Sequence, residues 1–146
     1  MENSNHFNVI VIGAGISGIG AGYYLKKNCP NKSFCIIEGR ENIGGTWDLF
    51  KYPGIRSDSD MFTLGYAFKP WKEQKTIANG PSILSYLEET VEENNLREKI
   101  KFSHKVLSAN WNSAERNWEV RAAHHEQEIL LTCLLYTSPS PRDGIG

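Results

Sequence analysis

A glycine-rich turn between two apolar segments is the feature that most constrains this fold. Residues 9–12 are Val-Ile-Val-Ile, a β-branched run of the length of a buried strand. Gly13, Gly15 and Gly18 follow in a G-x-G-x-x-G pattern, and residues 16–28 are compatible with a helix. In that setting the first glycine allows a tight turn, the second lets a pyrophosphate approach the backbone, and the third lets the helix pack against the strand. The pattern predicts a dinucleotide site at the helix N-terminus, where free N–H groups and the helix dipole favour an anion.

A carboxylate stands where such a site needs one. A second apolar run at residues 33–37 predicts a strand parallel to the first, and Glu38 follows it. Glu38 lies about 20 residues beyond Gly18, the spacing at which dinucleotide folds place the acid that binds the ribose hydroxyls. The alternative is that the glycines only shape a turn and that Glu38 is an ordinary strand-end acid. The agreement of strand, turn, helix, strand and acid favours the binding site.

The composition narrows the class of protein. The chain has 146 residues, enough for one domain with a core of its own. Lys plus Arg number 16 and Asp plus Glu 17, so the net charge of -1 gives no indication of nucleic acid or an anionic membrane as a partner. No apolar run reaches the roughly 20 residues of a transmembrane segment, and the polar N-terminus is not a secretory signal. The three scattered cysteines indicate reduced thiols and a cytoplasmic protein, and the histidines lack metal-ligand spacing.

The spacing of apolar residues divides the remaining chain into a loop, two helices and a series of strands. Residues 39–60 show no periodicity and are expected to form a long loop, which in a compact domain usually carries function. Residues 61–68 are expected to form a short helix, and residues 81–94 an amphipathic helix with an apolar stripe. From residue 100 the period changes to two, which predicts strands at residues 101–102, 105–111, 118–122 and 128–135. The adjacent His124 and His125 are expected to point to opposite faces of a strand and to be solvated.

A second glycine pair, Gly44-Gly45, follows the ribose acid by a few residues. A fold that binds only a nicotinamide dinucleotide has no obvious need for it. A flavin dinucleotide does, because its ribityl chain and ring must pass close to the backbone. A flexible turn between two elements is the alternative interpretation of this pair.

The stretch around that pair resembles a known family. Residues 44–66, Gly-Gly-Thr-Trp-Asp-Leu-Phe-Lys-Tyr-Pro-Gly-Ile-Arg-Ser-Asp-Ser-Asp-Met-Phe-Thr-Leu-Gly-Tyr, resemble the FAD loop of the class B flavoprotein monooxygenases. That family comprises flavin-containing and Baeyer–Villiger monooxygenases, and the chain most resembles the Baeyer–Villiger type that activates the prodrug ethionamide. The resemblance runs from about Phe7 to Thr132. It implies an α/β fold: a Rossmann-like FAD-binding parallel sheet with an antiparallel β-meander, truncated before the NADPH-binding domain.

The resemblance also implies roles for individual residues. The FAD pyrophosphate would be wrapped by Gly13, Gly15, Ser17 and Gly18, and the adenosine ribose held by Glu38. The path of the ribityl chain and flavin ring would be lined by Gly45, Thr46, Trp47, Asp48 and Leu49. The place where the flavin meets the NADPH nicotinamide would be formed by Arg56, Ser57 and Asp58, with Arg56 and Asp58 as the catalytic candidates. The backbone of Val106 would meet the adenine. A loop-capping aspartate is the alternative for Asp58, and plain core, the commoner place for a strand valine, is the alternative for Val106.

The implied activity is oxygenation of a small molecule. In this family NADPH reduces FAD, the reduced flavin traps O₂ as a C4a-peroxide, and a ketone, thioether or amine is then oxygenated. Two alternatives stay open: a non-catalytic nucleotide-binding module, and an FAD-dependent NAD(P)H oxidoreductase that does not oxygenate. The family's second glycine-rich fold, its His, Trp and Pro signature and its active-site arginine are not found in this sequence. The fragment is therefore expected to be inactive by itself.

The last residues depart from the family. Pro139 and Pro141 cannot occupy a central strand, so the segment is expected to be extended or disordered. It also resembles the translated read-through of a sequencing adapter. We therefore expect residues 1–132 to be the FAD-binding domain and residues 133–146 a foreign tail. A genuine divergent tail is the alternative.

Overall fold

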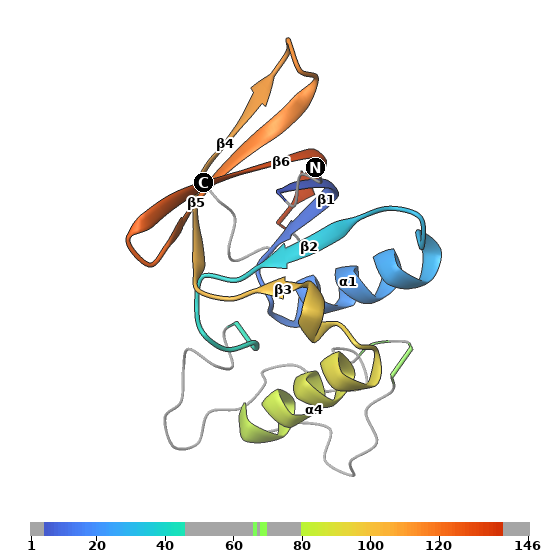
Figure 1. Ribbon diagram of the computed structural model, residues 1–146. Coiled ribbons are helices and arrows are strands. Elements are labelled where there is room, and N and C mark those ends of the chain that lie inside the picture. Colours follow the sequence, from blue (N-terminus) through green and yellow to red (C-terminus); the bar gives the residue numbers. More distant parts are fainter. Residues whose placement is uncertain (1–4, 46–65, 67, 70–79, 139–146) are drawn as a thin grey trace.

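The computed structural model describes residues 5–45, 66, 68–69 and 80–138 (Figure 1). In chain order, its elements are β1 (His6–Ile12), α1 (Ile16–Asn28), β2 (Phe34–Ile37), α4 (Gly80–Glu93), the 3₁₀ helix η1 (Arg97–Lys99), β3 (Ile100–Lys101), β4 (His104–Asn112), β5 (Asn117–His124) and β6 (Gln127–Thr137). Among these residues the strands form one six-stranded sheet in the order β3-β2-β1-β6-β5-β4. The pairs β1–β2, β2–β3 and β1–β6 are parallel, whereas β4–β5 and β5–β6 are antiparallel.

The parallel strands separate two cores because their side chains alternate between the two faces of the sheet. In β1, Val11 belongs to one buried cluster and Ile10 to the other. The four residues of β2 are all buried, with Phe34 and Ile36 in the first cluster and the two others in the second. This burial on both faces explains why these strands are continuous apolar runs in the sequence.

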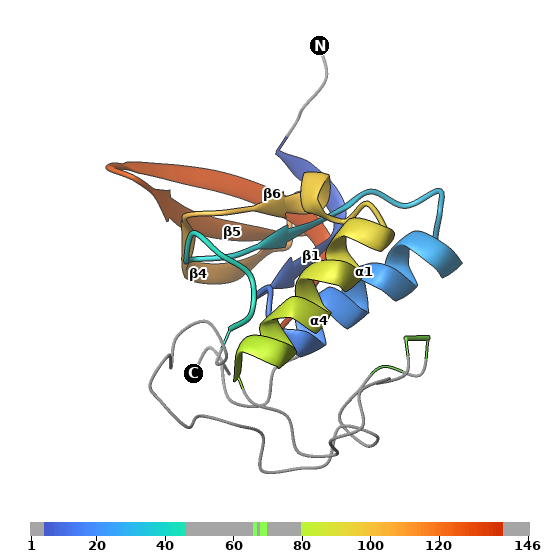
Figure 2. The same cartoon turned by 90° about the horizontal axis from the view of Figure 1, so that it is seen from below.

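Two helices cover one face of the parallel strands (Figures 1 and 2). Ile19 of α1 and the stripe Ile83, Leu87 and Val91 of α4 all lie in the first cluster, each fully buried. Their spacing of three and four residues places the α4 side chains on one side of that helix. The acidic side chains of α4 fall between them and remain exposed.

The antiparallel strands β4, β5 and β6 cover the opposite face. Val120 of β5 and Leu131 of β6 pack in the second cluster with Ile10 and Ile37 from the parallel strands. Strand β6 joins the antiparallel and the parallel parts of the sheet, since its first part pairs with β5 and residues 132–137 pair with β1. The result is a layer of helices, a layer of parallel strands and a layer formed by the meander.

The expected fold class is confirmed, and so are the helices at residues 16–28 and 81–94 to within one residue at each end. The expected strands are all present, with ends shifted by one to three residues. The short helix expected at residues 61–68 is wrong at its C-terminal end, because Tyr66 forms a β-bridge with Lys69 and Phe68 lies in a turn. Residues 61–65 lie outside the described residues.

The end of the described chain continues the sheet. Residues 133–137 were expected to follow the domain boundary, and in the structure they form the last part of β6 beside β1. The strand ends before Pro139, which lies outside the described residues. Whether residues 133–146 come from another sequence is not tested by their position in the fold, so their foreign origin stays a prediction.

The cysteines Cys29, Cys35 and Cys133 are all free thiols. No helix in the described ranges is both long and apolar enough to cross a membrane.

Candidate dinucleotide-binding site

The glycine-rich turn joins the end of β1 to the start of α1. Gly13 has a φ of 102°, a conformation that side chains rarely allow, and its N–H donates to the carbonyl of Ile37 at 2.7 Å. A Cβ on Gly18 would lie 1.8 Å from the carbonyl oxygen of Gly13. The predicted turn and close packing are therefore both present, and the glycines at these positions have no substitute.

The N-terminus of α1 is left available to an anion. Gly15 is the N-cap, and it offers no side chain to bond the first-turn N–H groups. That turn contains no acidic residue, while Lys26 and Lys27 stand in the last turn. The two lysines suit the negative end of the helix dipole, and the positive end, with no carboxylate in its own first turn, stays available to an external anion. Ser17 lies in this first turn, as the sequence predicted.

The second glycine pair, Gly44-Gly45, packs against the glycine-rich turn. The N–H of Gly44 donates to the carbonyl of Ala14 at 2.9 Å, and Gly45, with a φ of 53°, lies against Gly15. A Cβ built on Gly45 would meet the Cα of Gly15 at 3.2 Å. The two glycine motifs, far apart in the sequence, therefore form a single cradle without side chains. This is the arrangement that a pyrophosphate and ribityl chain require from the backbone.

Glu38 lies directly beside the cradle. It is 6% exposed, and its carboxylate accepts the N–H of Ala14 at 2.7 Å and the N–H of Arg40 at 3.0 Å. Its backbone is held as well, because its N–H donates to the carbonyl of Lys101 and its carbonyl accepts the N–H of His104. A carboxylate offers about four acceptor positions, so about two remain for a pair of ribose hydroxyls. The residues present fit the adenosine diphosphate half of a dinucleotide.

Val106 lies on β4, two residues beyond the contact between His104 and Glu38. It is partly buried and packs on the second core cluster, next to an irregularity in the pairing of β4 with β5. Its predicted contact with an adenine stays a prediction. Residues Thr46, Trp47, Asp48, Leu49, Arg56, Ser57 and Asp58 lie outside the described residues, and their predicted roles are likewise untested.

Sequence reasoning missed one contributor to the site. The backbone of Ala14 both donates to Glu38 and accepts from Gly44, so it links the acid to the second glycine pair. Outside the site it also missed the close packing at Gly20, whose missing side chain makes room for Tyr66. A glycine in a helix interior costs about 1 kcal/mol relative to alanine, and that cost was the signal that Gly20 serves a purpose.

Histidine rings gather at the turn from β3 into β4, next to the backbone of Glu38. The rings of His104 and His124 stack with centroids 4.0 Å apart, and the ring of His125 lies 4.2 Å from that of His124. Nδ1–H of His104 donates to the carbonyl of Phe102 at 2.7 Å. The expectation that His124 and His125 point to opposite faces is wrong, because His125 follows the end of β5 with a φ of 59°.

The pKa of His104 in this cluster is lowered, which makes stability depend on pH. Burial is the main cause that lowers the pKa of His104, and its hydrogen bond to Phe102 opposes the shift. The positive charges that lower it further are those of His124, Lys101 and His125. Because the folded state binds this proton more weakly than the unfolded chain, the stability contributed by neutral His104 is complete above a pH of about 6.5 and falls as the pH drops through the lowered value.

We expect the urea midpoint of the chain to fall between pH 7.5 and pH 5.5, and to fall less in His104→Gln. Glutamine retains a donor for the Phe102 carbonyl but cannot be protonated in this range. The measurement is urea denaturation followed by circular dichroism at the two pH values. Equal drops in the two proteins would show that His104 is not the titrating group.

Comparison with known proteins agrees with this geometry. Residues 11–73 match a family described as an NAD(P)-binding Rossmann-like domain. The chain is 56% identical over 133 residues to the FAD-containing monooxygenase EthA of Mycolicibacterium smegmatis, covering 90% of this chain and 27% of that protein. It is 57% identical over 113 residues to the probable FAD-binding monooxygenase AlmA of an Acinetobacter species, covering 77% of this chain and 23% of that protein.

The chain is related to the N-terminal part of the FAD-containing monooxygenases. Among solved structures, an open form of cyclohexanone monooxygenase superposes with a TM-score of 0.81 at 28% identity, covering 91% of this chain and 26% of that one. The predicted resemblance to class B monooxygenases is confirmed. The chain spans about a quarter of the length of these relatives.

Proposed function

We propose that this chain is the FAD-binding part of an NADPH- and O₂-dependent flavin monooxygenase. The observation that carries the proposal is the cradle at the N-terminus of α1, where Gly45 lies against Gly15 and the carboxylate of Glu38 accepts the N–H of Ala14. The homology to FAD-containing monooxygenases supports FAD over other dinucleotides.

Each part of the cradle has a task toward FAD. The first-turn N–H groups of α1 bind the pyrophosphate, and Glu38 accepts the ribose hydroxyls. FAD supplies the redox chemistry when bound, passing reducing equivalents from NADPH to O₂ for oxygenation of a ketone, thioether or amine. The residues proposed to line the flavin are Thr46, Trp47, Asp48 and Leu49, and those proposed to stand where flavin and nicotinamide meet are Arg56, Ser57 and Asp58. We propose Arg56 and Asp58 as the catalytic pair.

The test is nucleotide binding by the 146-residue chain. We expect FAD to bind with quenching of its fluorescence, ADP to compete with it, and FMN, which lacks the adenosine, to bind poorly. With NADPH and a ketone or thioether, we expect no oxygenated product, because the chain spans only 27% of the relative's length. NADPH oxidation without product would favour the reductase alternative. Binding of ADP without any preference for FAD would favour the non-catalytic module.

We also propose that the family sequence ends near residue 132 and that residues 133–146 are foreign to it. The supporting feature is the pair Pro139 and Pro141, which cannot continue a central strand where the family resemblance implies a return to the sheet. Genomic sequence downstream of the codon for Thr132 decides the matter: a second glycine-rich nucleotide motif supports the proposal, and the sequence as printed followed by a stop codon contradicts it.

A further inference from the structure

Two stacked histidine rings close the turn that leads from β3 into β4. Nδ1–H of His104 donates to the carbonyl of Phe102 at 2.7 Å, and Nδ1–H of His124, on β5, donates to the carbonyl of Ser103 at 3.0 Å. The two rings are nearly parallel, with an interplanar angle of 13°. Ser103 has a φ of 60°, a conformation that is costly for a residue with a side chain and that needs such support. We call His104 and His124 the histidine pair.

This turn holds the backbone of Glu38. The N–H of Glu38 donates to the carbonyl of Lys101, and the carbonyl of Glu38 accepts the N–H of His104, both at 2.9 Å. Two residues further on, the carbonyl of Arg40 accepts the N–H of Ser103 at 3.0 Å. The chain leaving β2 and the chain entering β4 therefore run side by side (Figure 1). The turn that the histidine pair closes thus fixes the position of Glu38.

The position of that backbone decides where the Glu38 carboxylate lies. The carboxylate is almost wholly buried and accepts the N–H of Ala14, in the glycine-rich turn, at 2.7 Å. Hydrogen bonds weaken steeply as their length and angle depart from the optimum, so this contact tolerates little displacement of the backbone. A change in the turn is therefore transmitted to the oxygens that the proposed function assigns to the ribose.

A proton added to His104 works against this arrangement. Nδ1 already carries the hydrogen that Phe102 accepts, so acid adds a proton at Nε2 and makes the ring a cation. Burial is the main cause that lowers the pKa of His104. The described charges that lower it further are all positive: those of His124, Lys101 and His125. The bond to Phe102 survives protonation, so it is the buried charge and the repulsion that favour movement of the ring out of the turn.

The other ionisable neighbours do not reverse this balance. The carboxylate of Glu38 is engaged by the N–H groups of Ala14 and Arg40, and it is not among the charges that shift the pKa of His104. Lys105 follows His104 on β4 and adds another positive charge. Glu126, in the turn after β5, is exposed to solvent.

We propose that His104 is a positioning residue for Glu38: its neutral ring closes the turn that holds the acid, and its protonation weakens the binding of the dinucleotide. This role rests on the proposed function, in which Glu38 accepts the ribose hydroxyls of FAD. The coupling is reciprocal, because a proton that weakens FAD binding must itself be bound more weakly when FAD is present. Bound FAD is therefore expected to lower the pKa of His104 further.

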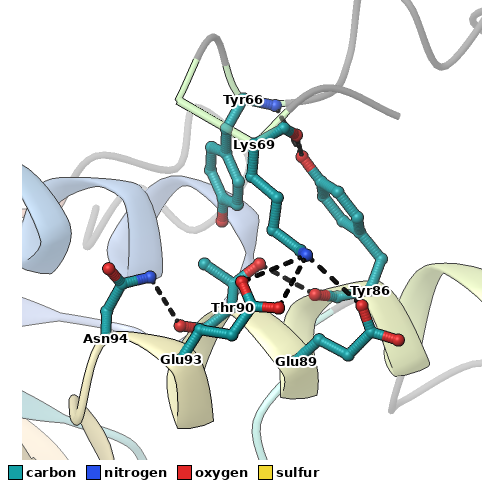
Figure 3. A network of polar contacts seen from close by, with 7 residues as sticks. All are labelled: Tyr66, Lys69, Tyr86, Glu89, Thr90, Glu93 and Asn94. Carbon is teal, nitrogen blue, oxygen red and sulfur yellow. Dashed lines mark hydrogen bonds and ion pairs between the residues drawn. The ribbon is translucent and has the colours of Figure 1, made fainter. Parts of the chain in front are cut away.

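A second polar network, between α4 and Lys69, offers a contrast (Figure 3). The hydroxyl of Tyr86 donates to the carbonyl of Lys69 at 2.5 Å, and Lys69 Nζ forms ion pairs with Glu93 at 3.2 Å and Glu89 at 3.3 Å. Burial raises the pKa of Tyr86, so its hydroxyl keeps its proton at neutral and acidic pH. The two carboxylates are well exposed, so their ion pairs contribute little. Among the residues drawn there, no buried group gains or loses a proton near neutral pH, unlike the histidine pair.

The experiment measures FAD affinity by flavin fluorescence at pH 7.5 and pH 5.5 for three forms of the 146-residue chain: wild type, His104→Gln and His6→Gln. Glutamine keeps a donor for the Phe102 carbonyl but cannot be protonated in this range. His6→Gln is the matched control, since it removes an imidazole that contacts Thr132 at the start of β1. FAD is used rather than ADP because a terminal phosphate titrates at a pH of about 6. Circular dichroism at both pH values restricts the comparison to folded protein.

We expect the FAD dissociation constant to rise about two- to fivefold between pH 7.5 and pH 5.5 in the wild type and in His6→Gln, and to change little with pH in His104→Gln. One proton taken up below a pH of about 6.5 limits the change to about tenfold. A second measurement needs no variant: NMR titration of the His104 ring in the wild type, with and without FAD, is expected to show a lower pKa in the complex.

Three results overturn the role of His104 while FAD binding at pH 7.5 leaves the proposed function in place. They are equal pH dependence in the wild type and His104→Gln, tighter FAD binding at pH 5.5, and a pKa of His104 that FAD does not lower. Tighter binding in acid would mean that a charged His104 attracts the pyrophosphate. A wild-type chain that does not bind FAD at pH 7.5 overturns the proposed function and this inference with it.

Discussion

Replacing Gly18 with alanine is expected to abolish the binding of both FAD and ADP and to lower the stability of the chain sharply. The new Cβ would lie 1.8 Å from the carbonyl oxygen of Gly13 and 2.9 Å from its carbonyl carbon. Both are backbone atoms, so no side chain can rotate away. Relief requires α1 to move off β1, which opens the turn that forms the cradle.

The size of the effect follows from what that movement breaks. Overpacking in a core costs about 1–3 kcal/mol and sometimes more, against a gain of about 1 kcal/mol in helix propensity. Moving the turn also strains the bond from Gly13 to Ile37 and the bond from Ala14 to Glu38, which close the site. Binding therefore suffers more than stability does.

Gly39→Ala provides the matched control. A Cβ on Gly39 would make only ordinary van der Waals contacts at 3.7 to 3.9 Å. Gly39 itself lies on the exposed surface just after the end of β2. We expect this variant to keep the wild-type urea midpoint and FAD affinity. A Gly18→Ala chain that binds ADP as the control does would show that the close approach of α1 to β1 is not needed for the site.

The sequence predicted the first half of the fold well because its signals are local. A β-branched run, a glycine turn and a stretch of helix formers define β1 and α1 over adjacent residues. The stripe of α4 and the period of two in the meander are local in the same sense. The sequence did not predict which strands pair when they are far apart in the chain. Residues 132–137 of β6 pair with β1, and no local pattern indicates that partner.

The site follows the same division. The glycines and Glu38 were predicted from spacing, and the structure brings them together. Their partner Ala14 was missed because it acts through its backbone, which any residue provides. Outside the site, the packing of Tyr66 on Gly20 was missed because it joins residues far apart in sequence. The error at His125 arose because β5 ends at His124 and the chain turns at His125, whose φ is 59°, so the alternation of strand side chains does not extend to it.

Glu38→Gln is expected to reduce FAD affinity by one to two orders of magnitude, and Glu38→Ala by more. The carboxylate accepts N–H groups from Ala14 at 2.7 Å and Arg40 at 3.0 Å, and it is almost wholly buried. Hydrogen bonds to a charged group contribute about 1.5–3 kcal/mol each. Glutamine replaces one acceptor oxygen with a donor, so one N–H or one ribose hydroxyl loses its partner.

Alanine removes both oxygens and leaves two backbone N–H groups without an acceptor, at a cost of about 1–3 kcal/mol each. Glu38→Ala should therefore lose stability as well as FAD, which distinguishes a residue that also holds the turn from one that only contacts the ligand. Glu41→Gln, which removes the same charge from an exposed position nearby, should change neither property. Fluorescence titration with FAD and urea denaturation of all three variants are the measurements. Wild-type FAD affinity in Glu38→Gln would mean that the ribose lies elsewhere, and the orientation of the dinucleotide in the cradle would have to be reversed.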